Sequence, residues 1–226
     1  MQQLILVFLF VYFSGVSFSQ QNRSVQFVPV FKGQKVELIK KYASEGNWFQ
    51  FESLRFYISA VSISGEKSTW IDQQTVHLID LEDSSSLFIS HEAKNGNRLN
   101  FYIGLDSATN VSGILDGDLD PIKGMYWAWN TGYINFKLEG FSSESILPDK
   151  HFEFHLGGYL FPNATLQAVE FSLENWQDSL VVELELGKLI PNLPWQSSPS
   201  ILIPGKEAVK ISKLLPTLFQ FPSDEK

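Results

Sequence analysis

The chain has 226 residues, a formal net charge of −8 and no cysteine. Without cysteine there is no disulfide, no thiolate metal site and no cysteine nucleophile, so any metal ion must use His, Asp, Glu or rarer donors. The acidic balance excludes a nucleic-acid partner, because such affinity comes largely from Lys and Arg contacts with phosphates. The 19 Phe, 7 Tyr and 6 Trp can supply a large apolar core without covalent cross-links.

The first 19 residues carry no charge and contain an apolar run of ten, Leu4 to Phe13. This run is too short to span a bilayer. The small residues of Ser17-Phe18-Ser19 follow it, as in a cleaved secretory signal, although the usual basic residues before the run are missing. We therefore expect a mature chain from Gln20, periplasmic or secreted, without stable membrane insertion. A buried N-terminal strand is the alternative.

Apolar residues recur at every second position along much of the chain, which is the pattern of a strand with one buried and one wet face. Gly, Asn, Asp and Pro clusters separate these segments. The pattern predicts an all-β, antiparallel β-sandwich-like single domain over residues 20–226, with short helical turns. The only helical pattern covers residues 208–215 and would end at Pro216. The alternating segments are 54–58, 76–78, 99–105, 134–138, 152–156, 169–173 and 180–186.

Motifs of common catalytic sites are missing from the sequence. It has no G-x-S-x-G elbow, H-E-x-x-H, Walker A loop or G-x-G-x-x-G, and nothing singles out a nucleophile. We therefore expect a protein that is not an enzyme.

Three aspartates, Asp116, Asp118 and Asp120, alternate as the first three ligands of a calcium loop do. They make calcium a candidate cofactor. The later positions depart from such a loop, because Pro121 stands where Gly is expected and Trp127 where Glu is expected. The alternative is that short acidic side chains cap turns here.

Two tryptophans, Trp127 and Trp129, lie in the string GMYWAWNTGYINFKLEG, and FEFHLGG follows about a dozen residues later. Together these strings resemble the signature of the copper-binding MbnP-like family of exported bacterial proteins. Residues 53–63, 76–81 and 101–107 resemble strands of that family in the same order. The resemblance extends over roughly residues 25–186.

The resemblance implies an exported β-rich domain that holds copper for storage or trafficking. Its ligands would be histidine and, in some members, a kynurenine made from tryptophan by a companion di-haem peroxidase-like enzyme. His155, Trp127 and Trp129 match the motif positions. Relatives often carry an Asn-His pair before the tryptophans, where this chain has Asn110-Val111.

A second ligand for His155 has to come from another strand or loop. His151 lies on the same strand face but about 13 Å away, because a strand rises about 3.3 Å per residue. The remaining donors are the imidazoles of His77 and His91 and the thioether of Met125, and we take His77 as the candidate partner and His91 as structural. The alternative function is a secreted, non-metal or calcium-stabilised binding module, whose exposed aromatic side chains would contact a carbohydrate or a protein partner.

Overall fold

The computed structural model describes residues 23–130 and 132–222, so the secretory signal expected at residues 1–19 lies outside the described residues. The strands are β1 (Ser24–Phe31), β2 (Gln34–Lys35), β3 (Lys41–Ser44), β4 (Asn47–Ser64), β5 (Thr69–Ile71), β6 (Val76–Asp80), β7 (Phe88–Ser90), β8 (Arg98–Ile103), β9 (Tyr126–Trp127), β10 (Gly132–Ser142), β11 (His151–Gly157), β12 (Gln167–Ser172), β13 (Ser179–Glu185), β14 (Ser200–Ile201) and β15 (Phe219–Gln220). The helical elements are α1 (Ser107–Val111), η1 (Gly117–Leu119), η2 (Pro121–Lys123), η3 (Leu186–Lys188), η4 (Ile190–Asn192), α2 (Lys206–Ser212) and η5 (Leu215–Leu218).

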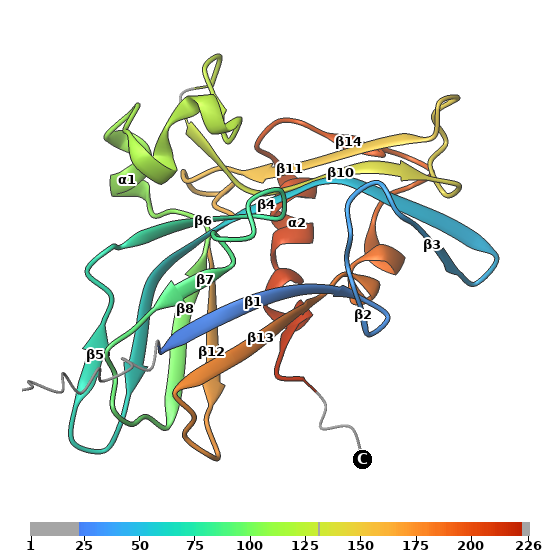
Figure 1. Ribbon diagram of the computed structural model, residues 1–226. Coiled ribbons are helices and arrows are strands. Elements are labelled where there is room, and N and C mark those ends of the chain that lie inside the picture. The colour runs from blue at the N-terminus through green and yellow to red at the C-terminus, as the bar shows by residue number, and fades with distance from the viewer. Residues whose placement is uncertain (1–22, 131, 223–226) are drawn as a thin grey trace, which may run out of the picture.

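The strands form two sheets that face each other as layers of a sandwich (Figure 1). The larger sheet runs β12-β8-β4-β10-β11-β14, and β3, β5, β6 and β9 pair with β4 or β10 at its margins. The smaller sheet runs β15-β13-β1-β2, with β7 also paired to β1. The predicted all-β, sandwich-like single domain is confirmed.

Two strand pairs differ from the antiparallel expectation. Strand β1 runs parallel to β13, and β11 runs parallel to β14. Both pairs join strands that are separated by long stretches of chain, and such long connections permit a parallel return. The alternation of apolar residues does not distinguish parallel from antiparallel pairing, because a strand with one buried face shows the same alternation in either case.

The main core lies between the two sheets. Phe27 of β1 packs its ring edge-on against Phe56 and Phe101 of the larger sheet, with centroids 6.4 and 5.5 Å apart. Ala208 and Ile211 of α2 are buried in the same core. The helix expected over residues 208–215 is therefore present, but it ends at Ser212, and Pro216 lies inside the following turn η5.

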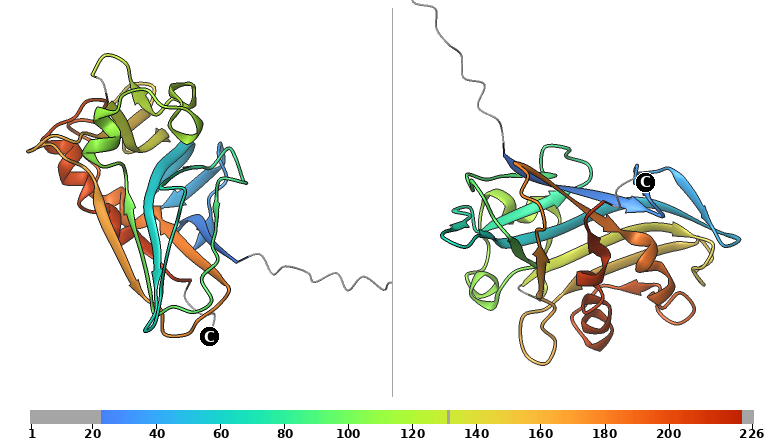
Figure 2. Two further views of the ribbon diagram at one scale, coloured as in Figure 1. Left: turned by 90° about the vertical axis from the view of Figure 1, so that its left-hand side faces the viewer. Right: turned by 90° about the horizontal axis from the view of Figure 1, so that it is seen from below.

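A smaller core lies on the outer face of the larger sheet. The segment from α1 to β9 crosses this face at one end of the sheet, on the side away from β1 and β13 (Figures 1 and 2). Tyr57 of β4 anchors the segment, because it is buried and its hydroxyl donates to the carbonyl of Asp118 at 3.1 Å. The buried members of this second core are Tyr57, Leu78, Leu105, Met125, Trp127, Tyr133 and Ile134.

Among the described residues, no helix has the length and apolar character needed to cross a bilayer.

Candidate metal site on the β10–β11 hairpin

Polar side chains face one another across the hairpin formed by β10 and β11. In the antiparallel register Lys137 lies opposite His155, and Glu139 lies opposite Glu153. Alternate residues such as Leu138 are buried in the main core. Because strand side chains alternate between faces, the four polar residues share the outer face of the larger sheet.

Glu139 is the centre of this cluster. Its Oε1 atom lies 2.6 Å from Nε2 of His155 and 3.1 Å from Nζ of Lys137. Potential ligand atoms of Glu139, Glu153 and His155 lie within 4.8 Å of one another, and no other group of three His or acidic residues meets that condition in residues 23–130 and 132–222. One ion can therefore reach all three side chains.

The cluster is largely shielded from solvent. The exposed fractions of the His155 and Glu139 side chains are only 13% and 19%. Burial alone would raise the pKa of Glu139, but the hydrogen bond with His155 and the ammonium of Lys137 outweigh it and lower the pKa below its ordinary value of 4.5. Glu139 is therefore an anion at neutral pH, which is the form that ligates metals.

Trp127 lies beside this cluster. A Cβ atom added to Gly157 would come within 2.6 Å of Cζ3 and 2.8 Å of Cη2 of Trp127, so the indole occupies the space where a Gly157 side chain would be. Gly157 and His155 are two residues apart on the same strand face, a separation of about 6.6 Å. Trp127 thus lies against the same strand as His155, two residues further along it.

Trp129 is placed differently. Its side chain is 63% exposed, and its rings lie 5.8 Å from those of Trp127, centroid to centroid. It lines a surface pocket of about 520 Å³ together with Phe161 and Ile203, which are also exposed. Trp129 therefore belongs to an exposed surface, whereas Trp127 is buried.

His77 is not brought together with His155. It pairs instead with the carboxylate of Asp72. Arg55 of β4 pairs with Asp80 of β6 on one side and with Lys137 of β10 on the other, so β4 lies between β6 and β10. Strand β11 lies beyond β10. Three strand spacings of about 4.8 Å separate β6 from β11 by about 14 Å, so His77 and His155 cannot ligate one ion.

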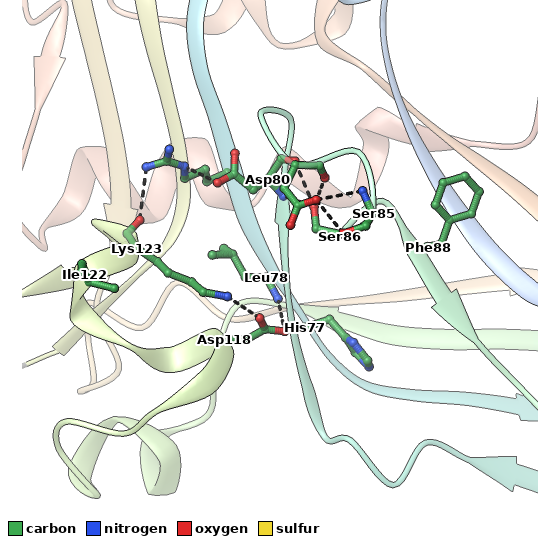
Figure 3. A pocket seen from close by; sticks show the side chains of 11 residues that line it. His77, Leu78, Asp80, Ser85, Ser86, Phe88, Asp118, Ile122 and Lys123 are labelled. Carbon is green, nitrogen blue, oxygen red and sulfur yellow. Dashed lines mark hydrogen bonds and ion pairs between the residues drawn. The ribbon is translucent and has the colours of Figure 1, made fainter.

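Asp116, Asp118 and Asp120 are not brought together as a group of three ligands in residues 23–130 and 132–222. Asp118 accepts from Nζ of Lys123 at 2.7 Å and from the backbone N–H of Leu78 at 3.1 Å, and Figure 3 shows its carboxylate directed at both. Asp120 caps η2 by accepting from the N–H of Ile122 at 2.9 Å. Asp116 precedes η1 without a side-chain cap. The turn-capping alternative thus fits Asp120, whereas Asp118 joins the loop to Lys123 and to β6.

Glu139 and Glu153 were not among the sequence-predicted site residues. The available signal was the period of two, which places Glu153 and His155 on one polar strand face. Glu139 lies near these two residues only because of the register in which β10 and β11 pair. This register contains a bulge between Ile134 and Phe136 and could not be predicted from the sequence.

Fold and cluster define an all-β, sandwich-like domain with a histidine and carboxylate site on the outer face of one sheet. The MbnP family model matches residues 20–203, and the chain belongs to that family. Among solved structures, MbnP from Methylosinus trichosporium shares the fold with a TM-score of 0.58 and 17% identity, over 84% of this chain and 86% of that chain. No curated protein matches the chain. The family resemblance seen in the sequence is thus confirmed.

Proposed function

We propose that the chain is an exported copper-binding protein that stores or traffics copper without catalysing a reaction, and that the ion binds at His155. Family membership supports an association with copper. The observation that carries the proposal is the cluster itself, in which one imidazole and two carboxylates lie within 4.8 Å of one another. This donor set fits copper, because nitrogen and oxygen ligands suit the divalent ion.

The test is copper stoichiometry in purified, copper-loaded protein. His155→Ala should abolish stoichiometric copper. His151→Ala is the matched control, since His151 lies on the same face of β11 but about 13 Å from His155 and should leave copper bound. Equal copper in both variants would contradict the proposal.

We further propose Trp127 as the tryptophan converted to kynurenine, if a di-haem peroxidase-like partner acts on this chain. Its place against Gly157, two residues along β11 from His155, supports this assignment, whereas Trp129 is largely exposed. Co-production with such an enzyme should change the mass of a peptide containing Trp127. The change should persist in Trp129→Phe and vanish in Trp127→Phe, and the opposite pattern would assign Trp129.

Export rests on the charge-free N-terminal segment and its small-residue site at Ser17-Phe18-Ser19. The intact mass of the exported protein should correspond to a chain beginning at Gln20. A mass that includes residues 1–19 would contradict the periplasmic or secreted location.

The alternative, a non-metal binding module, is favoured by one observation. Phe161 is 95% exposed beside Trp129 and Ile203, so large apolar side chains gather at one surface pocket. Exposed aromatic rings of this kind can stack on sugars or pack against a protein. Oligosaccharide binding that is lost in Trp129→Ala, together with unchanged copper content in His155→Ala, would favour this alternative.

A further inference from the structure

We propose that His91 is the centre of a proton-operated latch at one end of the sandwich. The latch consists of His91, Trp70, Trp176 and the ion pair of Arg23 with Asp178. When the His91 ring takes up a proton, the latch releases the start of β1 and the loop between β12 and β13, residues 173–178, while the rest of the fold stays closed. This inference concerns a part of the molecule that the proposed copper site does not use.

Three remote segments of the chain meet at His91. Its backbone N–H donates to the carbonyl of Arg23 at 3.0 Å, directly before β1 begins. Its ring lies against Trp70 of β5 and against Trp176 of the loop, with centroids 5.8 and 5.7 Å away. Figure 1 shows these elements at the lower left of the view. Because β5 belongs to the larger sheet and β1 to the smaller one, His91 joins the two sheets at this end.

The loop between β12 and β13 is anchored by Trp176. The indole packs against the main core, and a Cβ atom added to Gly96 would come within 3.2 Å of its Cζ3 atom. The flanking residues Asn175 and Gln177 are exposed. At the start of the loop the N–H of Leu173 donates to a carbonyl of the neighbouring segment at 2.8 Å. A loss of the contact between Trp176 and His91 would therefore free most of the loop.

The enclosure of His91 suits only the neutral ring. The side chain is buried, and within the described residues neither ring nitrogen has a hydrogen-bond partner. A protonated imidazole has two N–H donors, and each needs an acceptor. The faces of Trp70 and Trp176 can attract a cation, but aromatic rings are weak hydrogen-bond acceptors. A charged His91 is therefore poorly accommodated until the ring reaches water.

Arg23 and Asp178 are the charged groups that face His91. They form an ion pair, with Nε of Arg23 2.7 Å from Oδ1 of Asp178. Burial and then the charge of Arg23 lower the pKa of His91 below its ordinary value of 6.5, and Asp178 opposes this shift. A proton on His91 would compete with Arg23 for the carboxylate of Asp178. It would thereby weaken the ion pair that connects the start of β1 to the loop.

The other elements around His91 bring little further charge to the ring. Trp70 is flanked by the uncharged residues Thr69 and Ile71 on β5. The remaining charged residues of the surrounding segments are exposed, so that solvent screens them: Glu92, Lys94 and Glu174. Arg23 and Asp178 thus set the local charge that a protonated His91 would meet.

The direction of the pH effect follows from the two states of the latch. In the open state the ring is in water and has its ordinary pKa of about 6.5, whereas in the closed state its pKa is lower. Below about pH 6.5 the open state takes up the proton first. The opening equilibrium should therefore rise by up to about tenfold per pH unit, until the pH reaches the pKa of the closed state.

The experiment is amide hydrogen exchange of the whole protein, measured by nuclear magnetic resonance at about pH 6.5 and about pH 5.5 and corrected for the intrinsic pH dependence of exchange. The reporters are the amides of Ser24, which donates to the carbonyl of Asp178 at 3.2 Å, and of Leu173. Their protection should fall by up to about tenfold at the lower pH. The fall should vanish in His91→Phe, which keeps a ring but removes the titrating group. His151→Gln is the control and should keep it.

Low concentrations of urea distinguish the latch from unfolding of the whole chain. Local opening exposes little surface, so exchange at Ser24 and Leu173 should depend only weakly on urea. The amide of Ile134 on β10, which donates to the carbonyl of Met125 at 2.8 Å, should be better protected and depend on urea more steeply.

Two results would overturn the latch. One is a fall in protection that persists in His91→Phe, and the other is equal protection and equal urea dependence at Ser24, Leu173 and Ile134. If His91→Phe fails to fold, the comparison of these three amides in the unaltered protein still decides.

Discussion

His91 is a buried histidine enclosed by two tryptophans. Its ring lies 5.8 Å from that of Trp70 and 5.7 Å from that of Trp176, centroid to centroid. Its side chain is 6% exposed, and within the described residues neither ring nitrogen has a hydrogen-bond partner. The expectation of a structural role fits this environment, but the enclosure itself could not be predicted, because Trp70 and Trp176 come from distant parts of the chain.

His91 should make the protein less stable in mild acid. Burial lowers its pKa below the ordinary value of 6.5, the charge of Arg23 lowers it further, and Asp178 opposes the shift. The unfolded chain therefore takes up this proton at a higher pH than the native chain does. The stability linked to His91 is fully present above the unfolded pKa and is lost as the pH falls from about 6.5 through the native pKa.

The measurement is the free energy of unfolding in urea at about pH 7.5 and about pH 5.5, on either side of the ordinary imidazole pKa. His91→Phe should reduce the difference between the two values and cost little at the higher pH, because no hydrogen bond of the ring is lost. His151→Gln, which alters a partly exposed histidine, should keep the difference. An unchanged pH dependence in His91→Phe would contradict the role assigned to burial.

At the scale of elements, the segment from α1 to β9 is held to the sheet by its own polar side chains. Asp106 caps α1 by accepting from the N–H of Thr109 at 2.7 Å, and that bond is the main cause of its lowered pKa. Asn110 of α1 accepts from the N–H of Tyr133 at 3.0 Å and so ties the helix to β10. This segment carries Trp127 to its place against Gly157, so its polar anchors position that indole.

Asp118 is the aspartate whose loss should matter most in that segment. Asp118→Ala removes the acceptor of the Leu78 N–H and the partner of Lys123 and should lower the free energy of unfolding by about 1–2 kcal/mol, as expected for a lost polar partner.

Calcium at millimolar concentration should leave the melting temperature of chelator-treated protein unchanged, because no ion would stabilise the native state by mass action. A calcium-dependent rise in melting temperature that disappears when Asp118 and Asp120 are both changed to Asn would instead support a calcium site at these residues.

Element identity was largely predictable for the strands. All seven alternating segments of the sequence overlap described strands, because a half-buried strand needs apolar residues at every second position, and three of them run one or two residues past the end of β8, β12 or β13. The exact end of α2 was less predictable. The helical pattern continues to residue 215, but the chain tightens into η5 one residue before Pro216, and such local tightening depends on core packing.

At the scale of the whole molecule, the pairing of the strands decides which residues of the candidate site could be predicted from the sequence. His155 and Trp127 carried a motif and could be identified from it. Glu139 could not, because its contact with His155 exists only in one hairpin register. The distance between His77 and His155 likewise depends on β4 and β10 lying between their strands. The alternation of apolar and polar residues predicts which face of a strand a side chain occupies. Its neighbours on other strands depend on how the strands pair in the folded sheet.

The most direct test of the copper site is the position of the ion in crystals of the copper-loaded protein, located by anomalous scattering at the copper absorption edge. The proposed binding site predicts one principal peak within bonding distance of Nε2 of His155, next to the carboxylates of Glu139 and Glu153. A principal peak at His77, at Asp118 or beside Trp129, with none at His155, would contradict it.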